Sequence, residues 1–226
     1  MEKLLLGIDD AGRGPVIGPM VLAGVLIDAK TSADFKKSGV KDSKQLTQNR
    51  REFFENLIKE KSESFESVVI SPEQIDTNNA EGLKLNELEA IAAAKIINKL
   101  NNPKKIRGAK IKVVVDCPSP SIQKWQDYLK THIDDLSNLE ISCEHKADRN
   151  HPSVSAASIL AKTEREREVK KLQEKYGEEI GSGYPSDPKT KTFLAKNAKK
   201  HPGLFRKTWK TWQKANHDLD QKKLGF

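Results

Sequence analysis

The stretch Lys-Ile-Lys-Val-Val-Val-Asp (110–116) constrains the fold more than any other part of the sequence. Its centre is a run of β-branched residues without polar alternation, which is typical of a strand buried on both faces. Strands of this kind lie in sheets that helices cover on both sides. We therefore expect an α/β fold. Asp116, at the end of the run, is the first candidate functional residue, because open α/β sheets bind ligands at the carboxyl ends of their strands.

The other hydrophobic patterns fit the same architecture. Apolar runs bounded by Gly, Pro or polar residues predict further strands at about 3–9, 19–28, 65–71 and 139–145. Apolar residues spaced three and four apart predict helices at about 48–60, 83–100, 121–133 and 151–177. The early strands follow one another closely and later ones alternate with helices, so we predict a mixed five-stranded sheet flanked by helices.

The chain of 226 residues is long enough for one good-sized domain with an appendage. We predict a catalytic domain over 1–180 and a C-terminal basic and aromatic helical segment over 181–226, which begins at the sequence Gly-Ser-Gly-Tyr-Pro. From Pro188 to His217 the chain has nine Lys or Arg and no Asp or Glu. The net charge of +8 also favours a polyanionic partner, and nucleic acid is the leading candidate. A solvated basic helix whose aromatic residues dock on the main domain is the plainer interpretation, and the two are compatible.

Composition also argues against several classes of protein. No apolar run approaches the roughly 20 residues that a membrane helix needs. The apolar stretch at the N-terminus, three leucines after Met-Glu-Lys, is too short for a signal peptide and has no cleavage site. Cys117 and Cys143 form no Cys-x-x-Cys pair and are interpreted as reduced thiols. We therefore predict a cytoplasmic protein, a monomer, with no membrane partner.

Four acids are expected at one edge of the sheet. Asp9 and Asp10 end the first predicted strand, Asp116 ends the Val-rich strand, and Asp148 follows the strand at 139–145. Asp-Asp followed by Gly could be a plain surface turn, but clustered carboxylates repel each other and need a compensating charge. Oxygen ligands indicate Mg²⁺ or Mn²⁺ rather than zinc. Two such ions about 4 Å apart serve phosphoryl transfer, so the pattern indicates a metal-dependent nuclease.

Five blocks in register resemble ribonuclease HII, the type 2 ribonuclease H, in its archaeal single-chain form. They are GIDDAGRGPVIGPMVLAGV (7–25), VKDSKQLT (40–47), VVVDCPSP (113–120), EHKADRNHPSVSAASILAKTERE (144–166) and GSGYPSDPKT (181–190). The resemblance implies a ribonuclease H-like fold and cutting of the RNA strand in RNA–DNA hybrids. It also implies incision at single ribonucleotides embedded in duplex DNA, leaving 3′-hydroxyl and 5′-phosphate ends. Asp9, Asp10, Asp116 and Asp148 would be the catalytic and metal-binding tetrad for two ions.

The same resemblance implies the substrate contacts. The Gly12-Arg13-Gly14 turn would contact the ribose 2′-hydroxyl, largely through its backbone, which fits because glycines allow close approach and this hydroxyl separates RNA from DNA. Tyr184 would stack on the neighbouring deoxyribose, although it could instead anchor its loop. The phosphate contacts would come from Ser43, Lys44 and Lys146, and we add Arg206 and Lys207 from the basic segment.

Asp10 departs from the family pattern, which has Glu at this position. Aspartate is one methylene shorter, so its oxygens retract by roughly 1.5 Å. Metal distances tolerate errors of only about 0.2 Å, so activity or metal preference could change. Two other functions therefore stay open. One is another nuclease or strand transferase on the same sheet, and the other is a hybrid-binding protein without turnover.

Two further residues and the C-terminal tail complete the expectations from the sequence. His145 neighbours the acids but is expected to pack or hydrogen-bond rather than act as a base, and Cys117 is expected to be a small buried hydrophobe. The tail Gln221-Lys-Lys-Leu224-Gly-Phe226 resembles, incompletely, the motif by which replication enzymes dock on the sliding clamp. Packing of Leu224 and Phe226 on the protein itself is the alternative.

Overall fold

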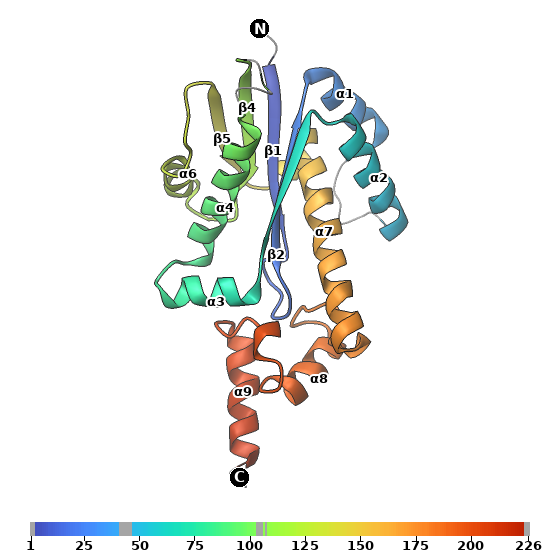
Figure 1. Ribbon diagram of the computed structural model, residues 1–226, viewed down its shortest axis with the longest axis vertical. Helices are drawn as coiled ribbons and strands as arrows, with labels where there is room; N and C mark the ends of the chain where they lie inside the picture. Colours follow the sequence, from blue (N-terminus) through green and yellow to red (C-terminus); the bar gives the residue numbers. More distant parts are fainter. Residues whose placement is uncertain (1–2, 41–46, 103–105, 107, 224–226) are drawn as a thin grey trace. The chain divides into compact units, whose positions relative to one another are not determined.

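The computed structural model describes residues 3–40, 47–102, 106 and 108–223 (Figure 1). The strands are β1 (Lys3–Ala11), β2 (Met20–Ile27), β3 (Ser64–Ile70), β4 (Lys110–Asp116) and β5 (Leu139–Glu144). The α-helices are α1 (Ala29–Ser38), α2 (Gln48–Lys61), α3 (Pro72–Ala80), α4 (Leu85–Leu100), α6 (Ile122–Lys130), α7 (Pro152–Tyr176), α8 (Pro188–Asn197) and α9 (Lys210–Lys223). Short 3₁₀ turns lie at Ala147–Arg149, Glu178–Ile180 and Pro202–Leu204.

The five strands form one mixed sheet in the order β3-β2-β1-β4-β5. Strand β1 runs antiparallel to β2 and parallel to β4, which is in turn parallel to β5. The predicted mixed five-stranded sheet is confirmed, and so is the placement of the Val-rich strand inside it. Because β1 and β4 are neighbouring parallel strands, their carboxyl ends meet at the same edge of the sheet.

Two helices were not expected from apolar periodicity, although their caps are visible in the sequence. In α1, the Asp28 side chain accepts a hydrogen bond from the Thr31 N–H at 2.6 Å, and Gly39 ends the helix with a φ of 80°. In α3, Ser71 and Gln74 form a capping box. Both helices are short and mostly polar, so their caps identify them better than any apolar face does.

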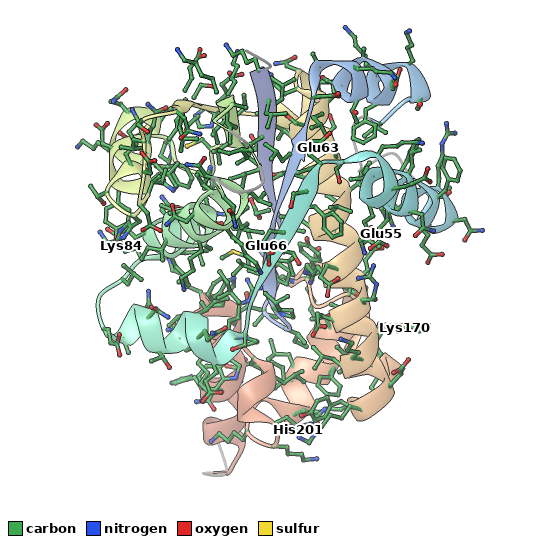
Figure 2. All side chains as sticks on the ribbon, turned by 45° about the horizontal axis from the view of Figure 1, so that its top comes forward. Glu55, Glu63, Glu66, Lys84, Lys170 and His201 are labelled. Atoms are coloured by element: carbon green, nitrogen blue, oxygen red, sulfur yellow. The ribbon has the colours of Figure 1, made fainter. Side chains whose placement is uncertain are left out.

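Helices cover both faces of the sheet (Figure 1). On one face, Val21, Ala23, Val25 and Ile27 of β2 pack in a core with buried residues of α1, α2 and the first half of α7. On the other face, Gly24 lies so close to α4 that a Cβ there would overlap the side chain of Ile96. Strand β3 is connected to the end of α4 by an ion pair, in which Lys99 Nζ lies 2.7 Å from Oε2 of Glu66 (labelled in Figure 2).

The chain forms two compact units, and their boundary differs from the predicted one at residue 180. The first unit comprises residues 1–11, 21–68 and 86–164 and contains the sheet. The second comprises 12–20, 69–85 and 165–226. Its core joins Val16 and Ile17 to buried residues of the C-terminal segment, and Ile17 forms a β-bridge with Phe205. Apolar packing between segments distant in the sequence therefore sets the boundary, and the Gly-rich linker does not. None of the helices in the described ranges has the length and apolar character that crossing a bilayer requires.

Candidate active site

Asp9 and Asp10 lie inside β1, opposite Ala23 and Leu22 of β2, whereas they were predicted to end the strand. The strand runs two residues further than expected, because Asp10 and Ala11 still pair with β2. Asp9 is buried, and its Oδ1 accepts a hydrogen bond from the Asp10 N–H at 2.7 Å. Because consecutive strand residues point to opposite faces, the side chains of Asp9 and Asp10 leave β1 on different sides. On its own side, Asp9 also accepts a hydrogen bond from Ser158 of α7.

Burial raises the pKa of Asp9 well above its ordinary value, and the negative charges of Asp10 and Asp116 raise this pKa further. The hydrogen bonds from Ser158 and the Asp10 N–H act in the opposite direction. Like charges have this effect only at short range. Three of the four predicted acids therefore lie within electrostatic reach of one another.

A sharp turn after β5 brings the fourth acid toward the same strand end. Lys146 has a φ of 58° and is the one described non-glycine residue with a positive φ. The turn lets the Ala147 N–H donate to Asp116 Oδ1 at 3.1 Å. Asp148 follows directly and is buried, and its backbone carbonyl accepts a hydrogen bond from Ser155 Oγ at 2.5 Å. Strained backbone of this kind is concentrated at functional sites, so its position beside Asp148 supports a site here.

A narrow pocket contains three of these acids together with a residue that the sequence analysis missed. Asp9, Asp10 and Asp116 line it with Glu89 of α4 and Trp125 of α6. Glu89 is almost fully buried. In the sequence, Glu89 could have been noticed as an acid beside the apolar residues Ala90, Ala92 and Ala93 of a predicted helix. The structure shows that these alanines are buried.

The donor chemistry of the cluster fits a hard divalent cation, because the side chains offer carboxylate oxygens. However, within the described residues no group of three or more His, Cys, Asp or Glu side chains is arranged to hold a metal ion. The acids are therefore neighbours, but the described side chains do not form a complete set of metal ligands. The metal-binding tetrad stays a prediction.

The predicted substrate contacts Gly12, Arg13 and Gly14 lie in the second unit, immediately after β1 in the chain. Gly12 has a φ of 86°, a conformation that favours glycine, and a Cβ there would overlap the side chain of Arg165. Tyr184 is close by, since a Cβ on Gly14 would lie 3.8 Å from its Cε1 atom. The structure thus brings the turn and Tyr184 together within one unit.

Arg165 links the turn to Tyr184 and was missed by the sequence analysis. Its guanidinium lies 5.0 Å from the centre of the Tyr184 ring, in a cation–π arrangement. Its Nη2 donates to the Ser182 carbonyl at 3.1 Å. Tyr184 keeps 40% of its surface exposed, so one face of the loop is held while the ring stays accessible.

The predicted phosphate contact by Arg206 is wrong. The side chain is fully buried, and its guanidinium donates hydrogen bonds to the carbonyls of Gly12, Arg13 and Gly18. A buried guanidinium needs such acceptors because an unsatisfied buried charge is costly. The neighbouring Lys207 is exposed and remains a candidate for a phosphate contact, as does the exposed Lys146.

Other expectations are resolved in part. His145 Nδ1 lies 3.0 Å from the Cys117 carbonyl oxygen, so the predicted hydrogen-bonding role is confirmed. Cys117 and Cys143 are buried and neither forms a disulfide, and burial raises the pKa of the Cys143 thiol to about 12. Ser43, Lys44, Leu224 and Phe226 lie outside the described residues, as does the side chain of Gln221.

Solved structures with the same architecture define the class of protein. The crystal structure of ribonuclease H2 from Pyrococcus horikoshii OT3 matches with a TM-score of 0.84 and 36% identity, covering 96% of this chain and 99% of that chain. The structure of the PCNA:RNase HII complex from Archaeoglobus fulgidus matches with a TM-score of 0.78 and 38% identity, covering 93% and 96%. The fold is therefore that of a ribonuclease H-like hydrolase.

Sequence comparisons identify the family. The family model described as ribonuclease HII matches residues 6–212. The ribonuclease HII of Methanocaldococcus jannaschii is 40% identical over 229 residues, covering 98% of both chains. That of Pyrococcus furiosus is 40% identical over 220 residues, covering 96% of this chain and 93% of the relative. The chain belongs to the ribonuclease HII family and is an endonuclease of the ribonuclease H type.

Proposed function

We propose that this chain incises duplex DNA at single embedded ribonucleotides, besides cutting the RNA strand of RNA–DNA hybrids. The observation that carries the proposal is the gathering of Asp9, Asp10 and Asp116 around one pocket, where burial, and then the neighbouring charges, raise the pKa of Asp9. Acids held this close at the ends of parallel strands suit phosphodiester hydrolysis supported by divalent cations. Family membership supports the substrate class.

The acids would hold two divalent ions, with Asp148 completing the set that Asp9, Asp10 and Asp116 begin. Mg²⁺ or Mn²⁺, when bound, supplies charge stabilisation to the phosphoryl group and lowers the pKa of water. Ser158 holds the Asp9 carboxylate through its hydroxyl, and the Ala147 N–H holds Oδ1 of Asp116. These bonds orient both acids from the protein side.

In the reaction a water oxygen attacks the phosphorus of the scissile phosphodiester, and the bond from phosphorus to the 3′ oxygen breaks. The products carry a 3′-hydroxyl and a 5′-phosphate. The Gly12–Gly14 turn would bind the ribose 2′-hydroxyl, and Tyr184 would stack on the next deoxyribose with Arg165 behind its ring. Stacking on an aromatic ring is tolerant of base identity, which suits an enzyme that must act at any sequence.

Three labelled duplexes test this proposal: one with a single ribonucleotide, one RNA–DNA hybrid and one of DNA alone. We expect cleavage of the first two when Mg²⁺ or Mn²⁺ is added and none of the third. Cleavage of the DNA duplex would favour a different nuclease. Binding of all three without cleavage would favour the non-catalytic alternative, which the family comparisons do not favour.

We also propose that the tail residues Gln221, Leu224 and Phe226 dock on the sliding clamp. The relative from Archaeoglobus fulgidus was solved as a complex with PCNA. A short segment with two apolar anchors should bind with a Kd in the micromolar range, near −8 kcal/mol. The test is titration of the clamp from the same source with the full chain and with a chain ending at Asp220. Equal binding by the two proteins would contradict the proposal.

A further inference from the structure

Arg206 makes an unusual set of hydrogen bonds to one short loop. Its Nη1 donates to the Arg13 carbonyl at 2.9 Å and its Nη2 to the Gly12 carbonyl at 2.7 Å. Its Nε and Nη2 both donate to the Gly18 carbonyl, at 3.1 and 3.0 Å. The guanidinium thus fixes both ends of the loop that runs from Gly12 to Gly18. All these residues belong to the second unit.

This arrangement dictates which way the turn directs its amide groups. In a planar trans peptide the carbonyl and the following N–H point in opposite directions. Because the carbonyls of Gly12 and Arg13 point at Arg206, the N–H groups of Arg13 and Gly14 point away from it. Gly14 is exposed. Two successive amide donors are therefore directed to the side of the turn opposite the buried cation.

The shape of the guanidinium is essential to this effect. Its planar fork serves several carbonyls at once, whereas the ammonium of a lysine is a single point charge. Trp209 lies against the same group, with the guanidinium carbon 5.0 Å from its ring centre, and this contact holds the fork in place. The neighbouring Lys207 is exposed and offers charge without this geometry.

We propose that Arg206 is a positioning residue for ribonucleotide recognition. It sets the polarity of the Gly12–Gly14 turn so that the N–H groups of Arg13 and Gly14 donate to the ribose 2′ oxygen. Arg206 itself stays buried and does not touch the substrate. The inference rests on the proposed incision at embedded ribonucleotides, and it adds a residue and a physical cause to that specificity.

The test compares Arg206→Lys and Arg206→Met with the natural chain on a duplex containing one ribonucleotide. An otherwise identical DNA duplex, added as a competitor, reports binding that does not involve the 2′ oxygen. For Arg206→Lys we expect kcat/KM to fall about tenfold or more, as loss of hydrogen bonds to a charged donor implies. The inhibition constant of the DNA competitor should stay within about twofold of its original value, because backbone phosphate contacts are sequence- and sugar-independent.

Lys207→Met is the matched control, because it removes an adjacent positive charge that is exposed. It should raise KM and the competitor's inhibition constant together, with a weaker salt dependence and an unchanged kcat. If Arg206→Lys behaves like this control, or changes neither constant, the proposal is overturned. Failure of the natural chain to cut the ribonucleotide duplex would instead reject the proposed function.

A measurement on the natural chain covers the case in which both variants fail to fold. The amide resonance of Gly14 is followed by NMR in EDTA, while either the ribonucleotide duplex or the DNA duplex is added. We expect a larger shift with the ribonucleotide duplex, because only that duplex supplies the 2′ oxygen as an acceptor. Equal shifts with both duplexes would overturn the proposal.

Discussion

The environment of Asp9 opposes the negative charge of its own carboxylate. Burial, and next the charges of Asp10 and Asp116, raise its pKa, so ionisation of Asp9 costs folding stability as the pH rises. The protonated form of Asp9 therefore stabilises the folded state. This contribution is fully present below the pKa of Asp in the unfolded chain, about 4, and is lost as the pH rises through the raised pKa of the folded state. We predict that Asp9→Asn melts a few degrees higher than the natural chain in metal-free neutral buffer, although it is inactive. Melting curves near pH 4 and pH 8 check this, and an advantage that is no larger at pH 8 would contradict it.

The short side chain of Asp10 should determine which divalent ion supports more turnover. The shorter side chain should suit Mn²⁺ better than Mg²⁺, which demands near-ideal octahedral geometry at about 2.0–2.1 Å. We therefore expect more turnover with Mn²⁺ than with Mg²⁺ in the natural chain, and a rise in Mg²⁺-dependent turnover for Asp10→Glu. Rates with both ions check this. If Asp10→Glu is slower with both ions, the site has adapted to aspartate.

Tyr184 is half-exposed and rests on Arg165, which fits a ring held ready for a sugar. Tyr184→Ala should reduce cutting at a lone ribonucleotide by about tenfold, the scale of one lost stacking contact. The loss in a long RNA–DNA hybrid should be smaller, because no deoxyribose follows each ribonucleotide there. Values of kcat/KM for the natural chain and Tyr184→Ala, measured on both substrates, decide whether the ring stacks on the sugar or only supports its loop. Equal losses on both substrates would show that the tyrosine only supports its loop.

At the scale of elements, helix α3 anchors the chain that enters α9. Asp76 of α3 accepts hydrogen bonds from the Lys207 N–H at 2.8 Å and from the Thr208 N–H and hydroxyl at 3.1 and 3.0 Å. Asp76→Ala leaves these donors without their acceptor and should cost about 0.5–2 kcal/mol, as for a lost helix cap. Denaturant unfolding measures the loss. Thr77→Ala, at the next and exposed position, is the control and should change stability little.

The elements also show what local sequence can and cannot predict. The strands were predictable because Val113, Val114 and Val115 form an uninterrupted apolar run, and turn residues bound the other strands. Helices α1 and α3 were missed because their sequences are mostly polar, so only the caps at Asp28 and Ser71 indicate them. The end of β1 was placed too early because Asp is disfavoured in strands, and pairing with β2 outweighs that preference here.

At the scale of the whole molecule, the chemistry of the acids was more predictable than the division of the chain. Asp9, Asp10 and Asp116 are marked by their positions on strands, which local pattern reveals. Arg206 is buried because it donates hydrogen bonds to the carbonyls of Gly12 and Gly18, which lie almost two hundred residues earlier in the chain. Local sequence patterns do not reveal contacts between such distant segments. The second unit mixes early and late segments for the same reason.

The central claim is that the acids of β1 and β4 perform the hydrolysis. The most direct test is the turnover of Asp116→Asn on a duplex with one ribonucleotide in saturating Mg²⁺ or Mn²⁺, measured beside Asp127→Asn. Asp127 is an exposed residue of α6, so its substitution controls for loss of one carboxylate. We predict that Asp116→Asn loses activity by orders of magnitude while remaining folded by circular dichroism, and that Asp127→Asn keeps its activity. Near-normal turnover of a folded Asp116→Asn protein would contradict the account.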